Sequence, residues 1–421
     1  MFFKIINKLN CKKNFPYYIS TPLVYGIGNA SEHILLAANY AERLGKKLLI
    51  FKTRYFQKFL GYHVCNNALF DSLILNNQTN KKFFFYFITD CLIQIEFVLR
   101  RASAIFFKKF FDIDLGESFR FALLGREVHI TKKITNYNQI TPFSIKEATV
   151  DLEYRQKKEC YKLLRSNGIK DKKFVCLHVR DNKYRNDAGR REYRNSDVNN
   201  YIELINFLTS KDYYVFRLGD KPAPKVNFSN KQFIDVPYSN IKSELMDLFL
   251  IKECEFYVGT LSGTLDTAYL FNKPVLLTNT YELFPSFPRK KNDRAIFKKI
   301  IDKKTEETIN IKDFAKFNIK YHDSLLDIKK DIMFEENSEE ELYDAVKEYL
   351  DLINKKNHLN NIQIKFNELL HKRLEEIYNE DVVKNNIFKS DKHRSNVFMT
   401  VIKRFKSCEG AYNNSYLEKN L

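Results

Sequence analysis

Several residue types and patterns are rare or missing in this sequence of 421 residues. Its seven cysteines include no C-x-x-C pair, and no histidine stands at zinc-ligand spacing, which excludes a disulfide framework and a structural zinc site. The most apolar run, 83–99, contains Asp90, Gln94 and Glu96, which are costly at the centre of a bilayer. The apolar N-terminus is too short and too interrupted for a secretory signal. The sequence therefore predicts a cytoplasmic protein without a membrane-spanning helix.

The motifs of common cofactor-dependent enzymes are also missing. The G-x-G at Gly26 and Gly28 has Ser31 where a dinucleotide fingerprint carries its third glycine. No Gly-Lys-Ser/Thr follows the loop at 259–263, and there is no nucleophile elbow, H-E-x-x-H or kinase motif set. The single D-x-D, at 112–114, follows no clear strand. The sequence thus predicts neither a bound cofactor nor a metal ion.

The composition describes a folded protein whose basic charge is spread along the chain. Hydrophobic residues make up 44% and charged residues 29%, and the length suits two domains of about 150–200 residues. The net charge is +18, with lysines scattered from Lys4 to Lys419 among acidic residues. A nucleic-acid-binding protein gathers its basic residues on one face or arm, so no nucleic-acid partner is predicted. The densest basic stretch, 289–304, is interpreted as a solvated helix face.

One aromatic segment, 83–111, supports two interpretations. It combines many phenylalanines with Arg100, Arg101, Lys108 and Lys109. A core helix with a basic outer face is the favoured interpretation. A helix lying on an anionic membrane surface is the alternative, so peripheral contact with the inner face of the cell membrane stays open.

The start of the chain predicts a βαβ unit. In the run that starts at Tyr17, a strand and a glycine turn precede a helix whose apolar residues Ile34, Ala38 and Ala41 recur at helical spacing. A short strand, 48–51, follows, so a parallel sheet is expected. The pair Asn167-Gly168 ends a helix at 154–165. We place a first domain at 14–150 and a second at 151–330.

The second domain alternates strands and helices regularly. Strands are expected at 174–179, 213–218, 233–236, 255–258 and 275–277, and helices at 197–208, 242–251 and 264–271. This alternation is typical of a doubly wound α/β domain. Asn337 or Ser338 can cap a further helix with acidic residues in its first turn. The segment 331–421 is predicted to be a helical extension.

Polar residues gather where three predicted strands end, the edge at which α/β sheets bind ligands. His178 and Arg180 share a face of the first strand, and this pair can grip a diphosphate. The third strand ends in a loop of small and hydroxyl residues before a helix, with room for a phosphate. A structural histidine, a helix-capping aspartate and a plain turn are the alternatives. The residues that predict a nucleotide-diphosphate pocket at these ends are His178, Arg180, Asp181, Arg217, Gly219, Asp220, Gly259, Thr260, Ser262 and Gly263.

The order of these motifs resembles a bacterial family of glycosyltransferases of the GT-B fold that act in surface polysaccharide synthesis. The resemblance runs over 178–279, through H-V-R-D, Y-R-N-S-D, V-F-R-L-G-D, G-T-L-S-G and L-T-N. The G-I-G-N at 26–29 with its following helix is similar, more weakly, to the opening of bacterial fucosyltransferases. The resemblance implies an α/β protein with two facing Rossmann-like domains, in which the second binds a nucleotide sugar and the first receives the acceptor.

The resemblance also implies roles for individual residues. Arg180 would hold the donor diphosphate without a metal ion, with His178 and Asp181 beside the reacting atoms. Asp181, Glu192 and Glu32 are candidates for the general base. The donor-binding residues would be Arg217, Gly219, Asp220, Gly259, Thr260, Ser262, Gly263 and Asn279. The acceptor side would contain Gly26, Gly28, Asn29, Glu32, Tyr193, Arg194 and Asn195.

The function implied is transfer of a sugar from a nucleotide donor to a saccharide or lipid-linked acceptor. Two other functions stay open from the sequence. One is a nucleotide-sugar epimerase or hydrolase of the same fold, which would turn over sugar nucleotide without an acceptor. The other is a non-enzymatic basic module that binds anions, for which clustered charge and steep salt dependence are required.

Overall fold

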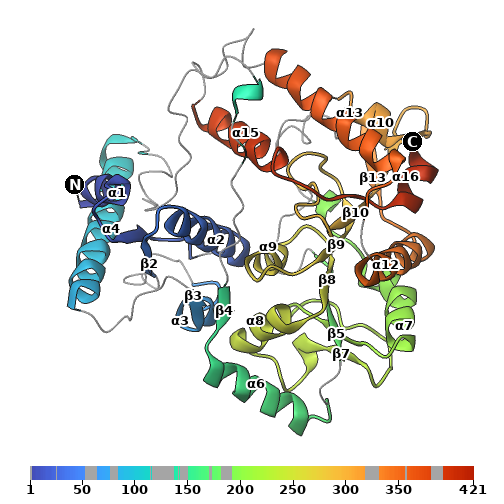
Figure 1. Cartoon of the computed structure of the whole chain (residues 1–421), viewed down its shortest axis with the longest axis horizontal. Coiled ribbons are helices and arrows are strands. Elements are labelled where there is room, and N and C mark those ends of the chain that lie inside the picture. Colours follow the sequence, from blue (N-terminus) through green and yellow to red (C-terminus); the bar gives the residue numbers. More distant parts are fainter. Residues whose placement is uncertain are drawn as a thin grey trace.

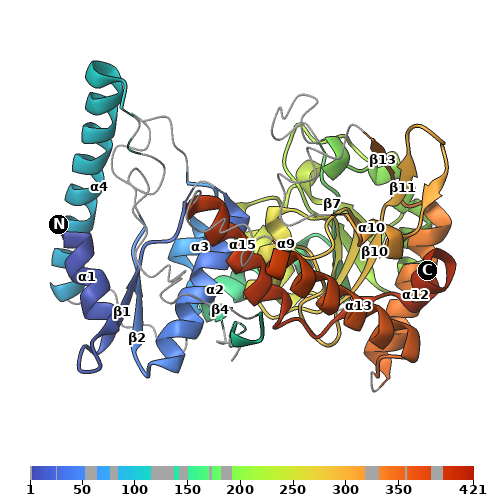
Figure 2. The ribbon, with the colours of Figure 1, turned by 90° about the horizontal axis from the view of Figure 1, so that it is seen from above.

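The computed structural model of the chain describes residues 2–24, 26–52, 64–75, 84–113, 115, 137–140, 142, 150–169, 173–181, 192–317, 331–355, 358–380 and 392–421. Two α/β units lie side by side (Figure 1, Figure 2). The first unit contains the N-terminal sheet and its helices, and the second contains a larger sheet. The Asp114 of the D-x-D and the loop 182–191 lie outside the described residues.

The second unit is built on a seven-stranded sheet whose paired strands are all parallel, in the order β14-β10-β9-β8-β5-β6-β7. The central strands are buried along their whole length, as parallel strands covered on both faces should be. The prediction of a parallel α/β sheet is confirmed. Its strands are β5 (Phe174–His178), β6 (Tyr214–Arg217), β7 (Phe233–Asp235), β8 (Phe256–Gly259), β9 (Val275–Thr280), β10 (Arg294–Phe297) and β14 (Ala411–Tyr412).

Helices connect these strands along the chain. The predicted helix at 197–208 begins as a 3-10 turn, η3 (Val198–Tyr201), in which the Asn199 amide donates to the Asp197 carboxylate. The connecting helices are α6 (Tyr154–Ser166), α7 (Ile202–Ser210), α8 (Glu244–Glu253) and α9 (Gly263–Leu270), with 3-10 turns η2 (Glu192–Arg194) and η4 (Val236–Tyr238).

The first unit is a βαβ unit, as predicted. Strands β1 (Tyr17–Ser20) and β2 (Lys47–Ile50) are parallel and are joined by α2 (Ile27–Arg43). Side chains alternate between the two faces of a strand. Tyr18 and Leu48 therefore join the core beneath α2, while Ile19 and Leu49 pack against α1 (Phe2–Cys11) and α4 (Phe84–Phe111) on the other face.

Short antiparallel pairs complete the sheets. Strand β3 (Leu73–Leu75), which follows α3 (Ala68–Asp71), pairs with β4 (Val150–Leu152). Strand β11 (Lys299–Asp302) lies between β12 (Thr308–Ile309) and β13 (Ile332–Glu335). Two further short helices, η1 (Tyr137–Gln139) and α10 (Ile311–Phe314), lie in connecting segments. Among the described residues, no helix is both long enough and apolar enough to cross a membrane.

The segment 331–421 is mostly helical and contributes to both units. Its helices are α12 (Glu339–Asn354), α13 (Asn361–Tyr378), α15 (Lys392–Phe405) and α16 (Asn414–Asn420). The Ser338–Glu341 capping box confirms the predicted start of α12. The segment also adds strand β14 to the edge of the large sheet, beside β10. Helix α15 reaches back to α2, where Arg404 pairs with Glu32.

The basic stretch at 289–304 is not a solvated helix face, and that interpretation was wrong. Residues 294–302 form β10 and β11. Arg294 is fully buried, with its guanidinium on the carbonyls of Lys291 and Asp293, and Lys298 is buried against the Asn195 carbonyl. Backbone oxygens, which a sequence pattern does not display, allow these cations to be buried.

Candidate functional site

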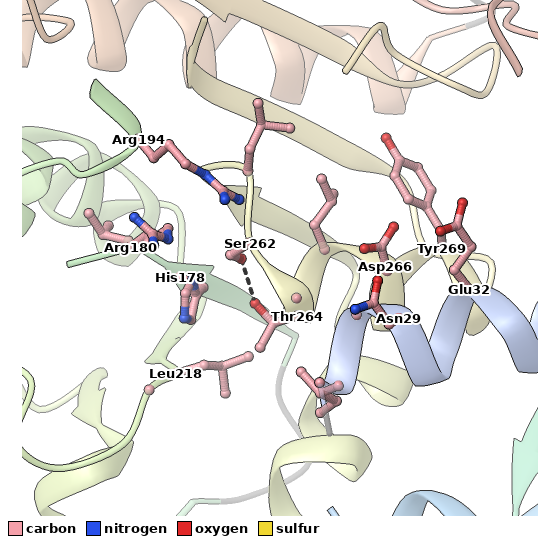
Figure 3. A pocket seen from close by; sticks show the side chains of 18 of the residues that line it. Asn29, Glu32, His178, Arg180, Arg194, Leu218, Ser262, Thr264, Asp266 and Tyr269 are labelled. Atoms are coloured by element: carbon pink, nitrogen blue, oxygen red, sulfur yellow. Dashed lines mark hydrogen bonds between the residues drawn. The ribbon is translucent and has the colours of Figure 1, made fainter. Parts of the chain in front are cut away.

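The candidate site is a cavity of about 730 Å³ where the two units meet. It lies beyond the C-terminal ends of β5 and β6 and beside the N-termini of α2 and α9, the expected place in an α/β protein. Polar side chains from both units project into it (Figure 3). The predicted residues that line it are Gly26, Gly28, Asn29, Glu32, His178, Arg180, Asp181, Arg194, Arg217, Gly219, Asp220, Ser262 and Gly263.

The ends of β5 and β8 set the position of Arg180. His178 is paired in register with Gly259, and a side chain on Gly259 would overlap the His178 carbonyl oxygen. The Thr260 amide donates to that carbonyl at 3.1 Å, and the Thr260 hydroxyl accepts from the Arg180 amide at 2.9 Å. Gly259 and Thr260 therefore hold the strand end together and do not themselves line the cavity.

Two guanidinium groups enter the cavity from the segment that follows β5. Arg180 donates to the side-chain oxygen of Asn195, and Arg194 lies beside it in Figure 3. The Nε atom of Arg194 is buried without a hydrogen-bond partner among the described residues. Tyr193 packs edge-on against Tyr281 at 5.0 Å. The predicted acceptor-side residues Tyr193, Arg194 and Asn195 thus lie on the Arg180 side of the cavity, in the second unit.

His178 is a neutral group in this cavity. Burial, reinforced by the positive charge of Arg217, lowers the pKa of His178 from 6.5 to about 4. Its Nδ1 atom is shielded from solvent and has no hydrogen-bond partner among the described residues. His178 can therefore offer a hydrogen bond to a ligand at neutral pH, whereas Arg180 and Arg194 supply positive charge.

The N-terminus of α9 faces the cavity from the same side. Ser262 is the residue before the helix, and its side chain makes no capping hydrogen bond. Its hydroxyl instead lies 3.0 Å from that of Thr264, which is 2.7 Å from the Tyr257 hydroxyl. The Leu265 amide donates to the Ser262 carbonyl at 3.2 Å, and the first turn has no side-chain cap from Ser262. An uncapped helix N-terminus suits an anion, which the helix dipole also favours.

The G-I-G turn of the first unit is a packing contact. A Cβ atom on Gly28 would lie 2.7 Å from the Gly263 Cα atom and 2.8 Å from Asp266 Oδ2. One turn further along, the hydroxyls of Ser31 and Thr267 are 2.9 Å apart. Gly28 and Gly263 therefore allow α2 and α9 to meet at backbone distance, and Asn29 and Glu32 are left to line the cavity.

An ionic cluster occupies the end of β6. The Lys242 ammonium lies 2.8 Å from Asp220 Oδ1 and 2.5 Å from Asp247 Oδ2, and it donates to the Gly219 carbonyl at 2.7 Å. Burial raises the pKa of Asp247 to about 6. Arg217 is buried and paired with Asp235 at 2.9 Å. Arg217 also lines the cavity, so its role in donor binding stays a prediction.

A second group of ion pairs lies between α2, α9 and α15. Asp266 pairs with Arg289 at 3.0 Å, and burial raises the pKa of Asp266. Glu32 pairs with Arg404 of α15. Figure 3 shows Asn29, Glu32, Asp266 and Tyr269 on the opposite side of the cavity from Arg180.

The candidates for a general base separate in the structure. Asp181 and Glu32 line the cavity, whereas Glu192 is exposed and does not. Asn279 also lies apart from the cavity lining: it has a φ of 53° and forms reciprocal hydrogen bonds of 2.7 Å with Asn337. Asn279 therefore ties the start of the C-terminal segment to β9.

Several lining residues were not predicted from the sequence. The spacing of Lys242 and Asp247 at the start of a helix is a weak signal that could have suggested them. The others stand inside helices, between β9 and β10, or in the C-terminal segment, where no motif marks them. These residues are Lys242, Glu244, Asp247, Asp266, Tyr269, Tyr281, Glu282, Ser286, Arg289 and Arg404. Among the described residues, no group of three or more His, Cys, Asp or Glu side chains is placed to hold a metal ion.

Comparison with known proteins gives no family for this chain. No family model matches it, and no curated protein matches it. Three solved structures are similar over part of their length. One is the dodecameric iron-containing heptosyltransferase TibC in complex with ADP-D-beta-D-heptose, with 18% identity, a TM-score of 0.18, and coverage of 26% of this chain and 27% of TibC.

The other two similarities are longer. The ADP-heptose LPS heptosyltransferase II of E. coli has 11% identity and a TM-score of 0.34, over 62% of this chain and 83% of that one. A glycosyl transferase family 9 protein from Veillonella parvula has 9% identity and a TM-score of 0.36, over 63% of this chain and 80% of that one. These similarities are too low to establish a function, and the α/β class of this chain follows from its own parallel sheet.

Proposed function

We propose that this protein is a glycosyltransferase of the GT-B type that moves a sugar from a nucleotide donor to a saccharide or lipid-linked acceptor. The observation that carries the proposal is the convergence of Arg180, Arg194 and the N-terminus of α9 on one cavity between two α/β units. Such a set of cations beside an uncapped helix N-terminus suits the diphosphate of a nucleotide sugar. The proposed domains are 14–150 for the acceptor and 151–330 for the donor, with 331–421 as an extension.

The proposed reaction is a single displacement. The acceptor oxygen bonds to the anomeric carbon, and the bond from that carbon to the diphosphate oxygen breaks, so the electron pair leaves on the diphosphate. Arg180, Arg194 and the α9 amides stabilise this negative charge. Neutral His178 adds a hydrogen bond, and Asp181 or Glu32 accepts the proton of the acceptor. No step in this scheme requires a metal ion.

Removal of the Arg180 guanidinium tests the donor site. We expect UDP, GDP or CMP compounds to raise the melting temperature of the wild-type protein, because a ligand that binds the folded state stabilises it. Arg180→Ala should weaken that ligand's binding by about 10- to 100-fold, the loss of one or two charge-assisted hydrogen bonds. Thermal-shift titration measures both the rise in melting temperature and the ligand affinity of each protein. Arg155→Ala, on the exposed side of α6, is the matched control.

Two results would contradict the proposal. An unchanged nucleotide affinity in Arg180→Ala would show that the donor site lies elsewhere. Consumption of a sugar nucleotide at the same rate with and without any acceptor would instead favour an epimerase or hydrolase in the same cavity.

A further inference from the structure

Helix α4 presents an apolar surface to solvent. Eleven of the nineteen exposed large hydrophobic residues of the described chain belong to α4 and the two residues after it. Leu99 is 61% exposed and Phe110 is 64% exposed. We call this set the α4 surface; its members are Phe87, Ile88, Leu92, Ile95, Leu99, Ile105, Phe106, Phe107, Phe110, Phe111 and Ile113. A soluble protein rarely leaves so many neighbouring apolar side chains in water without using them.

The opposite face of α4 is fixed to the first unit. The Glu96 carboxylate accepts from the Phe3 amide of α1 at 2.8 Å, and the Gln94 amide donates to the Lys52 carbonyl at 2.9 Å. Ile93 packs in the core between α4, α1 and the sheet, and Phe97 is also buried. Glu96 and Gln94, which interrupt the apolar run, thus form hydrogen bonds that hold α4 to the rest of the first unit. The helix cannot turn its α4 surface inward without breaking these contacts.

Basic residues accompany the α4 surface. Lys108 and Lys109 are exposed in the last turn of α4. Lys108 pairs with the exposed Asp112 at 2.6 Å, and the Lys109 ammonium lies 5.7 Å from the centre of the Phe110 ring. The neighbouring helix α1 exposes Lys4 and Lys8 and contains no acidic residue. Exposed phenylalanine and leucine next to lysine is the pattern of a helix that lies in the interface of an anionic bilayer.

We propose that the α4 surface docks the protein on an anionic lipid bilayer, with α4 lying in the plane of the membrane interface. Figure 2 shows α4 at the end of the molecule formed by the first unit, with its C-terminal half extending past the β1–β2 sheet. The helix can therefore meet a flat surface without hindrance from the second unit. This inference rests on the α4 surface alone and holds whatever reaction the cavity performs.

A second copy of the chain fits the α4 surface less well. The residues Ile88, Leu92, Ile95, Leu99 and Phe106 do recur at the spacing of a helix-pairing stripe. In paired helices, the positions beside such a stripe usually carry charges. Here two of them are Val98 and Ile105, so the apolar surface of α4 is wider than the contact surface of a helix pair. Two copies would also bring the positively charged lysines of each close together, which is unfavourable. An anionic bilayer would instead attract these lysines.

Fluorescence tests the proposal directly, because the chain has no tryptophan of its own. Phe110→Trp places a single indole on the α4 surface. We expect its emission to shift to the blue and gain protection from iodide when phosphatidylcholine vesicles with ~30% phosphatidylglycerol are added at ~0.15 M salt. Tyr154→Trp, an exposed position on α6, should show neither change. Equal emission of Phe110→Trp with and without vesicles would overturn the proposal.

Vesicle sedimentation separates apolar and electrostatic contributions. Leu99→Ser with Phe110→Ser, and Lys109→Glu with Lys8→Glu, should each weaken binding to these vesicles by about tenfold or more. Leu163→Ser on α6 and Lys365→Glu on α13 are the controls and should leave binding unchanged. Light scattering after gel filtration gives the mass in solution. Two results together would overturn the proposal: the wild type does not bind vesicles, and it forms a dimer that the Leu99→Ser, Phe110→Ser double variant does not form. The α4 surface would then be a contact between two copies of the chain.

Discussion

His178 stands at the end of β5 with a pKa of about 4, lowered from 6.5 by burial and by Arg217. The unfolded chain takes up the proton at a higher pH than the folded chain. The contribution of neutral His178 to stability is therefore complete above about pH 6.5 and is lost as the pH falls towards 4. A pKa shift of this size corresponds to about 3 kcal/mol, and less where solvent reaches the ring.

The substitution His178→Gln should remove this pH dependence. We expect the free energy of unfolding of the wild type, relative to the variant, to fall by about 2–3 kcal/mol between pH 7 and pH 4. Urea denaturation at several pH values measures it. Burial raises the pKa of Asp247 to about 6, and this group gives the opposite trend in both proteins, so it cancels in the comparison. Parallel pH profiles would contradict the low pKa of His178.

The contact between α2 and α9 joins the two units and depends on two glycines. Gly28→Ala would place a Cβ atom 2.7 Å from the Gly263 Cα atom, so one helix must move. We expect this variant to lose about 1–3 kcal/mol of unfolding free energy, the usual cost of overpacking. Asn29→Ala, exposed one residue later on the same helix, should change it by less than about 0.5 kcal/mol. Equal stability of both variants in urea denaturation would show that α2 and α9 separate easily.

The ion pair of Glu32 and Arg404 connects the first unit to the end of the chain across the cavity. Both side chains are mostly buried, so removal of one partner leaves the other unpaired in a poorly solvated place. We expect the double-mutant cycle of Glu32→Gln and Arg404→Gln to give a coupling free energy of about 1–3 kcal/mol in urea denaturation.

An exposed pair provides the matched control for that cycle. Lys419 and Asp344 lie 3.1 Å apart with half and a third of their side chains in solvent, and their coupling should be below about 1 kcal/mol. Similar coupling in the two cycles would mean that the Glu32–Arg404 pair does not hold α15 against the first unit.

Local patterns predicted the elements well where strands are apolar and helices carry caps. The βαβ unit at the start, the strand before His178 and the capped helix after Ser338 were found within a few residues of their bounds. The elements that were predicted wrongly depend on contacts with residues distant in the sequence. The basic stretch at 289–304 could not be recognised as strands with buried cations, because the hydrogen bonds of Arg294 and Lys298 go to backbone oxygens, which no sequence pattern displays.

The same division holds in the cavity. The residues after β5, β6 and β8 could be predicted because parallel strands end at one edge of a sheet. The internal pairing of Arg217 with Asp235 and the amide pair of Asn279 with Asn337 could not, since each partner comes from another segment. The cavity residues Arg289 and Arg404 had no local signal for the same reason.

The sequence by itself determined the alternation of strands and helices, the parallel sheet and the set of polar residues at its edge, because these follow from periodicity and chain direction. Only the tertiary structure decided which charged side chains line the cavity and which are paired inside the protein, because that depends on contacts between segments far apart in the chain. It also decided that the apolar residues of the interrupted run are exposed along α4. The reason is that Gln94 and Glu96, which interrupt the run, hold the other face of the helix to the first unit.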